Sequence, residues 1–438
     1  MAHRTTSFVT FTTAAILAGS ITVTPQVRPI VITAVNIVDV DNGRIIPNST
    51  VAIEGTRIAN IGQRTSSRDA RVVDGHGAFM IPGLWDMHSH TEAAGESALQ
   101  LHIANGVTGI RDMGSDLDVI LRLRDATASG RLLGPRIIAA GPILDDAPGE
   151  WPFRMRVKSA DEGRAAVQLL KRRGVDLIKV HNNTPRDAFF AIAEEAQRQQ
   201  LPLAGHIPLR VTPQEAIDAG LTNVEHLSEG RLWVPCSGGN RYRPDACGPF
   251  IETLVRRGIW QTPTLVASEL LTLGTPQSTV GADQVAYAGK KLREMWAGNQ
   301  SLITNPDALR ILKARRQESE AMTGDLARAG AKILAGCDAV IPGFCLHDEL
   351  AALVMGAGMT PLAALQTATL NPARYLGIES THGTVTPGKT ADLVLLDANP
   401  LTDIANVRKI RAVVVRGRLL DRAELDSVLA EVKVAAAK

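Results

Sequence analysis

The chain has 438 residues, and its 47 basic and 45 acidic side chains leave a net charge of +2. Hydrophobic residues make up 45% and charged residues 21%, which is ordinary for a globular protein with a large α/β core. This balance gives no electrostatic reason to expect nucleic acid as a partner. The sequence also contains no run of 18 apolar residues that would predict a membrane span. Aromatic residues amount to only 4%, so the ten histidines are the most informative feature of the composition.

The first twenty residues have the pattern of a secretory signal. Arg4 precedes an apolar, threonine-diluted run over residues 8–18, and small residues follow at positions 18–20. We expect residues 1–20 to be a signal peptide, which would place the protein in the periplasm or outside the cell. The alternative is an apolar N-terminal tail on a cytoplasmic protein.

Two of the four cysteines bracket a polar, irregular loop. Cys236 and Cys247 flank a segment rich in Gly, Arg and Pro, which would gain stability from a cross-link that an exported protein could form. We therefore predict a disulfide between them. No CxxC spacing occurs, which argues against a structural zinc knuckle.

Both ends of the chain read as short strands separated by turns. Residues 30–73 contain apolar runs divided by Asp-Asn-Gly and Glu-Gly-Thr, and the same pattern returns at ADLVLLDAN and IRAVVVRGRLL. We expect residues 28–80 and 384–422 to form one composite β-sandwich domain. Residues 423–438 would follow as a C-terminal helix or tail.

The middle of the chain alternates apolar runs with amphipathic stretches of helical period. Eight such runs occur: AFMIPGLWDMH, GVTGIRDMG, PRIIAAG, VDLIKVH, LPLAGHI, LTNVEHL, IWQTPTL and AKILAGCDA. Continuous apolar strands that alternate with helices indicate a parallel sheet buried on both faces, and eight units predict a (β/α)8 TIM barrel over residues 81–383. In that fold the site lies at the carboxyl ends of the strands, so the polar residues that end the runs are candidates.

Histidines and one aspartate end several of these runs. His88 and His90 are two apart, so both imidazoles point to the same face of their strand. His206, His226 and Asp338 each end a run of their own. Burying so many unpartnered polar groups would cost several kcal/mol, whereas histidine nitrogens and carboxylates are ordinary zinc ligands. The pattern therefore predicts a metal site.

Lys179 lies inside the apolar run VDLIKV, where an unpaired ammonium would be costly. One reading is that it pairs with a neighbouring carboxylate. The other is that its amine has reacted with carbon dioxide, which gives an anionic carbamate able to bridge two metal ions.

These residues together resemble the amidohydrolase superfamily, and more closely its imidazolonepropionase-like branch, which contains binuclear prolidase-type hydrolases. The resemblance is carried by PGLWDMHSH, GVTGIRDMG, VDLIKV, LAGHIP, NVEHL, ILAGCDA, LHDEL and GKTADLVLLDANP. It implies two divalent ions, with Zn²⁺ expected, and a carbamylated Lys179. One ion would be held by His88, His90, Lys179 and Asp338, and the other by Lys179, His206 and His226.

The resemblance also implies hydrolysis of an amide bond by a metal-bridging hydroxide. Asp338 would be the catalytic residue that takes the proton from the bridging water and passes it to the leaving amine. Expected substrates are dipeptides, Xaa-Pro-like peptides, N-acyl amino acids and ochratoxin-like amides. Members of this branch commonly form symmetric oligomers, so we expect a homo-oligomer.

Substrate-binding residues are harder to identify from the sequence. The candidates are Arg111, His181, Tyr242 and His347, together with the loop arginines Arg231, Arg241 and Arg243. Guanidinium groups match carboxylates, but solvated surface arginines explain the loop positions equally well. Packing roles are equally open for His181 and His347.

Two alternatives remain. A mononuclear deaminase or imidazolone-type cyclic amidohydrolase would use His88, His90, His206 and Asp338 as ligands, with His226 polarising the substrate and no role for Lys179. A non-catalytic interaction protein on the same scaffold would be expected to lose metal ligands, yet all six candidates are present.

Overall fold

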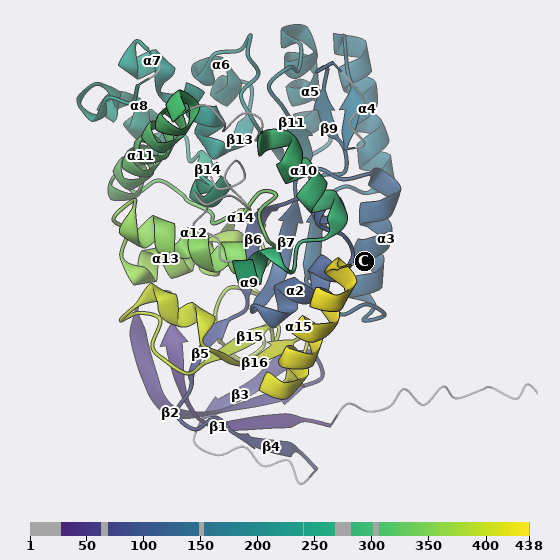
Figure 1. The fold of residues 1–438 in the computed structure, drawn as a ribbon, viewed down its shortest axis with the longest axis vertical. Helices are drawn as coiled ribbons and strands as arrows, with labels where there is room; N and C mark the ends of the chain where they lie inside the picture. The colour runs from purple at the N-terminus through teal and green to yellow at the C-terminus, as the bar shows by residue number, and fades with distance from the viewer. Residues whose placement is uncertain are drawn as a thin grey trace, which may run out of the picture.

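The computed structural model describes residues 28–62, 69–148, 153–239, 241–267, 282–300 and 306–437, so the predicted signal peptide lies outside the described residues. Figure 1 shows a sheet built from the chain ends at the bottom of the view and a larger α/β part above it. Among the described residues no helix is long and apolar enough to cross a membrane.

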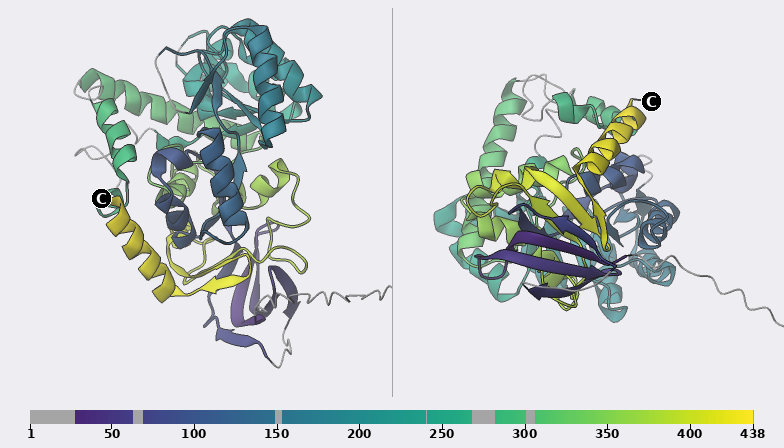
Figure 2. Two further views of the ribbon diagram at one scale, coloured as in Figure 1. Left: turned by 90° about the vertical axis from the view of Figure 1, so that its right-hand side faces the viewer. Right: turned by 90° about the horizontal axis from the view of Figure 1, so that it is seen from below.

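Both ends of the chain contribute to one mixed sheet. Its strands are β1 (Ile30–Asp39), β2 (Arg44–Glu54), β3 (Arg57–Gly62), β4 (Arg71–Asp74), β5 (Phe79–Pro82), β15 (Leu393–Leu396), β16 (Ile410–Val415) and β17 (Arg418–Leu420). Their order is β17-β16-β15-β5-β1-β2-β3, and β4 also pairs with β1. Figure 2 shows the purple N-terminal strands and the yellow C-terminal strands side by side when seen from below.

This sheet corrects two expectations. Strands from both chain ends pair with one another, but they form one hydrogen-bonded sheet instead of the two sheets of a sandwich, because β5 pairs with β15 on one side and with β1 on the other. The expected domain boundary at residue 80 falls inside β5, so the first apolar run of the middle region divides between this sheet and the next strand.

The α/β part contains two parallel sheets. One has the order β6 (Leu84–Ser89), β7 (Val107–Asp112) and β8 (Arg136–Ala139). The other joins β9 (Ile143–Asp145), β10 (Arg154–Arg156), β11 (Ile178–Val180), β12 (Leu203–Gly205), β13 (Leu221–Glu225) and β14 (Trp260–Thr262), in the order β10-β9-β11-β12-β13-β14. Several strands, such as β6 and β7, are buried throughout, which explains why they read as continuous apolar runs.

Single bridges connect the two parallel sheets. Ile333 pairs in parallel with Gln261 of β14, and Asp338 pairs in parallel with Ser89 of β6. The eighth predicted run thus lies between β14 and β6. Main-chain hydrogen bonds join it to both, such as Leu334 N–H to the Gln261 carbonyl and Met87 N–H to the Ala335 carbonyl, each over 2.9 Å. On the other side, the N–H of Asp176, just before β11, donates to the carbonyl of Ala139 in β8 over 2.9 Å.

Helices surround these strands (Figure 1). They are α1 (Thr91–Ala94), α2 (Ser97–Ala104), α3 (Leu117–Ala128), α4 (Ala160–Arg173), α5 (Arg186–Arg198), α6 (Pro213–Asp218), η1 (His226–Trp233), α7 (Val234–Ser237), α8 (Pro244–Arg256), α9 (Ala282–Val285), α10 (Lys290–Gln300), α11 (Pro306–Arg328), α12 (Phe344–Met355), α13 (Pro361–Thr367), α14 (Leu370–Tyr375), η3 (Ile404–Arg408) and α15 (Arg422–Ala436).

Local signals explain where representative helices begin and end. The Ser159 hydroxyl accepts from the N–H of Glu162 and caps α4, which ends at Gly174 with a left-handed φ of 84°. Asp421 and Glu424 form a reciprocal capping box that starts α15. This last helix corresponds to the predicted C-terminal helix, and it packs against α2 (Figure 1).

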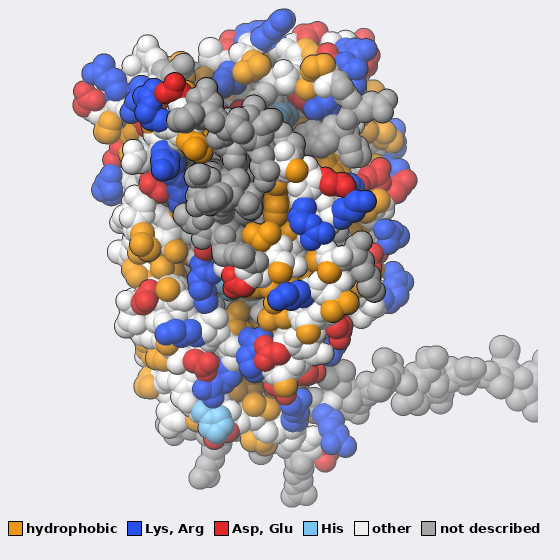
Figure 3. Space-filling model, viewed as in Figure 1, with side chains coloured by type: hydrophobic (Ala, Val, Ile, Leu, Met, Phe, Trp, Pro, Cys, Tyr) orange, Lys and Arg blue, Asp and Glu red, His pale blue; other side chains and the backbone are white. Residues whose placement is uncertain are grey.

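Two disulfides join the four cysteines. Cys236 is bonded to Cys247, which confirms the predicted pair. Cys337 is bonded to Cys345, a pair that the sequence did not suggest. On the face drawn in Figure 3, basic and acidic side chains are interspersed over the described surface, in keeping with the small net charge.

Candidate metal centre

The six predicted ligands meet at one cavity of about 460 Å³. They follow or end different parallel segments: His88 and His90 come from the end of β6, Lys179 from β11, His206 from just after β12, His226 from just after β13, and Asp338 from the eighth run. Because all these segments run in the same direction, their carboxyl ends lie together, and the side chains of residues distant in sequence face one space.

Each of the four histidines is held through its Nδ1 atom. The Nδ1–H of His88 donates to the Glu225 carboxylate over 2.7 Å, and that of His90 donates to the carbonyl of Gly114 over 3.1 Å. The Nδ1–H of His206 donates to Asn182 Oδ1 over 3.1 Å.

His226 follows the same rule. Its Nδ1 lies 2.5 Å from Thr264 Oγ1, and the Thr264 hydroxyl donates to the carbonyl of Pro263, so the threonine oxygen accepts from the imidazole. In His88, His206 and His226 the Nε2 lone pair is therefore free, the tautomer that metal-binding histidines adopt when an outer partner orients them, whereas His90 Nε2 faces the Asp338 carboxylate.

The free nitrogens cluster around Asp338. Asp338 Oδ1 lies 3.2 Å from His90 Nε2 and 4.0 Å from His88 Nε2, and Oδ2 lies 3.8 Å from His226 Nε2. The ring centroids of His206 and His226 are 4.9 Å apart. The buried His88 Nε2 has no hydrogen-bond partner among the described residues. An orphaned buried nitrogen beside a carboxylate and further imidazoles is a donor set that suits a divalent metal ion.

Burial keeps most of these imidazoles neutral. Desolvation, helped by the nearby Lys179 ammonium, lowers the pKa of His88 well below its usual value, and burial lowers the pKa of His226 to about 3. His90 differs: burial opposes its charged form, but the hydrogen bond with Asp338 raises its pKa. The same histidines hold the pKa of Asp338 well below its ordinary value although burial opposes this. The carboxylate is therefore ionised and the neutral imidazoles can donate lone pairs.

Lys179 is almost fully buried, at 1% exposure, and lines the same cavity. Within the described part of the chain no carboxylate lies within 4.0 Å of its amine, so the reading of a paired lysine is not supported. Burial lowers its pKa to about 8, which makes the neutral amine accessible near physiological pH.

The backbone is strained at several residues that line the cavity or lie beside it. The four residues from His226 to Glu229 have φ between 49° and 55°, and Thr264 and Asp338 have φ of 46° and 62°. Left-handed conformations cost non-glycine residues about 1–2 kcal/mol each. Strain of this kind persists where surrounding contacts enforce it and concentrates at functional sites. Here the Ser228 hydroxyl accepts from the N–H of Ile207 over 2.9 Å.

Arg111 does not face the cavity, contrary to the expectation that it binds substrate. It is fully buried, and its guanidinium donates to the carbonyl of Met87 and to Asn223 Oδ1, both over 2.6 Å, and to Glu225 Oε1 over 2.8 Å. Because Glu225 in turn orients His88, Arg111 supports the site through that carboxylate. A buried charge needs such partners, and here the neighbouring strands β6 and β13 provide them.

Other substrate candidates also lie away from the cavity. Tyr242 packs on Trp233 and donates to Asp325 over 2.6 Å, and His347 Nε2–H donates to the carbonyl of Asn105 over 2.9 Å. The three loop arginines are engaged elsewhere: Arg231 donates to the carbonyls of Ile207 and Pro208, Arg241 pairs with Glu318, and Arg243 pairs with Asp245. Among the substrate candidates, His181 does line the cavity, and its ring stacks 4.0 Å from that of His206.

Several lining residues were missed by the sequence reasoning. Glu229 lines the cavity three residues after His226, with its carboxylate 3.7 Å from His206 Nδ1. Arg315 and Arg316 reach the cavity from α11, and Ile143, Leu265 and Leu312 give it an apolar wall. Glu225 could have been noticed as the carboxylate that directly precedes a strand-end histidine. Helix α11 carried no such signal, because nothing in its sequence tells which face meets the parallel strands.

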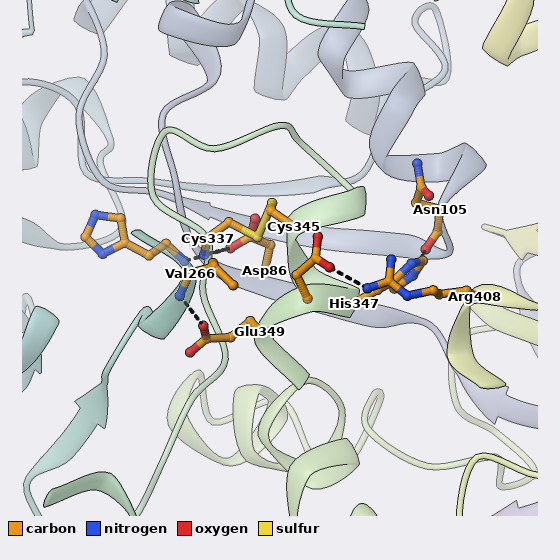
Figure 4. Close-up of a disulfide and its surroundings, with 10 residues drawn as sticks. Asp86, Asn105, Val266, Cys337, Cys345, His347, Glu349 and Arg408 are labelled. Carbon is orange, nitrogen blue, oxygen red and sulfur yellow. Dashed lines mark hydrogen bonds and ion pairs between the residues drawn. A yellow bond between two sulfur atoms is a disulfide. The ribbon is translucent and has the colours of Figure 1, made fainter. Parts of the chain in front are cut away.

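Asp86 lies beside the Cys337–Cys345 disulfide and connects the end of β6 to the segment that carries Asp338 (Figure 4). Its Oδ1 accepts from the N–H groups of His88 and Cys337, both over 3.1 Å. Burial raises the pKa of Asp86 to about 8, and within the part of the chain that the structure describes its Oδ2 has no hydrogen-bond partner. The Cys337–Cys345 bond closes the short loop that begins with Asp338, so this loop is fixed at both ends.

Comparisons with known proteins agree with this geometry. Residues 79–420 match the model of the amidohydrolase family. The chain is 25% identical to an ochratoxinase of Aspergillus niger, over 92% of this chain and 90% of that protein. A solved structure assigned as a prolidase from Bifidobacterium longum is 25% identical, with a TM-score of 0.71 over 93% of this chain and 100% of that one.

A bottromycin amidohydrolase, 23% identical, shares the fold with a TM-score of 0.75 over 94% of this chain and 91% of that one. The family match covers well over half of the sequence and includes all six predicted ligands. The chain therefore belongs to the amidohydrolase family and is a metal-dependent hydrolase of carbon–nitrogen bonds.

Proposed function

We propose that this protein is a binuclear hydrolase that cleaves an amide bond in a small substrate, such as a dipeptide, an Xaa-Pro-like peptide, an N-acyl amino acid or an ochratoxin-like amide. The observation that carries the proposal is the convergence of four Nδ1-anchored histidines, an ionised carboxylate and an unpaired lysine on one cavity. The bridges between the parallel sheets support placing this cavity at the mouth of a closed (β/α)8 barrel.

The donor set divides naturally into two groups. His88, His90 and Asp338 offer ligand atoms that all lie within 4.8 Å of one another, and they would hold one ion. His206 and His226 would hold the second. Neutral imidazoles and carboxylates are ligands that zinc prefers.

Lys179 would join the two groups as a carbamate. Its neutral amine adds to carbon dioxide and loses one proton, which converts a buried cation into an anion with two oxygen ligands. The absence of a carboxylate within 4.0 Å among the described residues supports this conversion, because an ammonium in this position would be buried without compensation.

Divalent ions bound in this centre would lower the pKa of water and polarise a carbonyl group. Asp338 is the residue suited to move the proton, because its ionised carboxylate lies at the cavity and can accept a proton from water and deliver it to the leaving nitrogen. His181 has a pKa lowered to about 3 by burial, so it faces the substrate space as a neutral ring that can hydrogen-bond. The wall of Ile143, Leu265 and Leu312 favours an apolar acyl or side-chain group.

A mononuclear deaminase or imidazolone-type cyclic amidohydrolase is the second candidate. It is favoured by the position of His226, whose Nε2 lies 3.8 Å from Asp338 and whose ring lies 4.4 Å from that of His88. One ion could then be shared by this cluster, and Lys179 would have no role.

Metal content and a substrate screen separate these functions. The purified protein is loaded with Zn²⁺, its metal is counted per chain by mass spectrometry, and hydrolysis of dipeptides, N-acyl amino acids, ochratoxin, cyclic ureas and adenine is followed. About two ions per chain, reconstitution that depends on carbon dioxide, and amide cleavage support the proposal. One ion per chain together with turnover of cyclic ureas or adenine supports the mononuclear alternative and overturns the binuclear proposal.

We also propose that the protein is exported. The two disulfides support this, because such bonds persist in oxidising compartments.

A further inference from the structure

Arg315 is a charged residue in the cavity wall to which the proposed chemistry gives no role. It reaches the cavity from α11. Its positive charge is opposite to that of Glu229, which lines the same cavity. Within the described part of the chain it makes neither an ion pair nor a hydrogen bond, whereas the neighbouring Arg316 is paired with Glu320 over 2.7 Å. A guanidinium normally has hydrogen-bond partners when it leaves bulk water, so an unpaired one at a substrate cavity points to a ligand.

The surroundings of Arg315 hold its guanidinium in place. Its central carbon lies over the Trp233 ring, 5.4 Å from the ring centre, a cation–π arrangement that favours this position of the group. Gly230 makes room beside this contact, because a Cβ atom there would clash with both an Arg315 guanidinium nitrogen and the Trp233 ring. Gly230 also has a left-handed φ of 83°, so both the space and the conformation favour glycine.

The platform beneath Arg315 is itself supported. Trp233 is fully buried, and its ring centroid lies 5.8 Å from that of Tyr242. Tyr242 donates to Asp325 on α11, the same helix that carries Arg315. The segment after β13 and helix α11 are thus joined around one guanidinium, which makes its position a built feature of the cavity.

Arg315 lies next to the metal centre. Glu229, which directly precedes Gly230, lies 3.7 Å from His206 and accepts from the Asn182 amide over 3.0 Å. The carboxylate of Glu229 is thereby engaged with the ligand side of the cavity. A substrate that reaches the metal ligands would extend past Glu229 to Arg315, with the apolar wall beside it.

We infer that Arg315 binds a carboxylate on the amino-acid part of the substrate, so that N-acyl amino acids with a free α-carboxylate are the preferred class. A guanidinium stacked on a ring keeps its edge free for two parallel hydrogen bonds to a carboxylate. The inference rests on the proposed amide hydrolysis, because it names the part of the substrate that lies beyond the scissile bond.

The test compares two probes that differ only in this charge: N-benzoyl-L-phenylalanine and N-benzoyl-L-phenylalaninamide. For the carboxylate probe, Arg315→Met lowers kcat/KM by about 10- to 100-fold, as expected for losing hydrogen bonds to a charged group. For the carboxamide probe, the same substitution changes kcat/KM by less than about 3-fold. Lys313→Met, on an exposed residue of the same helix, is the matched control and changes neither value.

A binding measurement separates this inference from the proposed function. Calorimetric titration of the Asp338→Asn protein with the carboxylate probe should give a Kd that weakens about 10- to 100-fold when Arg315→Met is added. If the wild-type protein cleaves no amide but this Arg315-dependent binding persists, only the proposed function fails. Equal affinity for both probes, no binding of either, or the same loss in the Lys313→Met control overturns the role of Arg315.

Discussion

The backbone N–H of Asp338 donates a hydrogen bond of 2.7 Å to the carbonyl oxygen of His88. The N–H of Cys337 donates to the same oxygen over 3.1 Å, and Asp86 accepts from both His88 and Cys337. The strand end that carries two histidines and the turn that carries the carboxylate are therefore one hydrogen-bonded unit. Because main-chain groups make these bonds, changes to the Asp338 side chain should leave the positions of the other ligands intact.

Asp338→Asn tests the proton-transfer role in this setting. The amide side chain is similar in size but cannot accept a proton, so kcat should fall by about 10²- to 10⁴-fold. The backbone bonds to His88 remain, so metal content, measured by mass spectrometry, should stay near that of the wild type. A variant that keeps near-normal turnover would remove Asp338 from this role.

The Cys337–Cys345 disulfide is expected to matter for catalysis as well as stability, because it closes the loop that begins at Asp338. Cys337→Ser/Cys345→Ser should lower the free energy of unfolding by about 2–3 kcal/mol. Loss of the constraint should also lower kcat by about 10- to 100-fold, since misplacing a reacting group by about 1 Å has that effect.

The other disulfide supplies the matched control. Cys236 and Cys247 do not line the cavity, so Cys236→Ser/Cys247→Ser should cost a similar free energy of unfolding while leaving kcat/KM unchanged. Denaturant titration and steady-state kinetics measure the two effects separately. Equal losses of kcat in both double variants would show that the Cys337–Cys345 bond acts through global stability alone.

Arg111 provides a test of the buried chain of contacts that ends at His88. Arg111→Met leaves the buried Glu225 carboxylate without its guanidinium partner, and breaking a buried pair in this way costs about 3–5 kcal/mol of stability. Metal affinity should fall about 10- to 100-fold, because Glu225 orients His88. At saturating metal, KM should not change, since Arg111 does not reach the cavity. A rise in KM without a change in stability would restore Arg111 as a substrate residue.

Strand-end chemistry could be predicted from the sequence because parallel strands impose it. His88, Lys179 and Asp338 are far apart in the chain, yet the βα alternation alone places the ends of their segments together. The same rule misled for Arg111, which follows the strand pattern but points into the interior, where Glu225 and Asn223 receive it. Periodicity predicts which face of a strand a side chain lies on, but it does not predict which residues the side chain contacts there.

The residues that escaped prediction depend on long-range packing. Arg315 faces the cavity only because α11 docks against the segment after β13, and that contact involves Trp233, Gly230 and Tyr242. The single sheet at the chain ends escaped for a similar reason: strand patterns show which residues are strands, but the choice of β5 as neighbour of β15 is made by the folded chain.

His102, a buried histidine outside the candidate metal centre, should make the free energy of unfolding fall in acid. Burial lowers the pKa of His102 to about 3, and no described residue hydrogen-bonds to its Nδ1. The unfolded chain binds a proton at this histidine below about pH 6.5, while the folded state does not until about pH 3. The free energy of unfolding should therefore fall by about 1.4 kcal/mol per pH unit for this residue as the pH drops below about 6.5.

His102→Leu isolates this contribution from other groups that titrate in the same range. The substitution removes the titrating group, so the stability of the variant relative to the wild type should rise by about 2 kcal/mol between pH 7 and pH 5. Denaturant titrations in the presence of a chelator measure this difference without a contribution from metal release. Parallel stability curves for the two proteins would contradict a neutral, buried His102, because a histidine that is protonated in the folded state loses no stability over this interval.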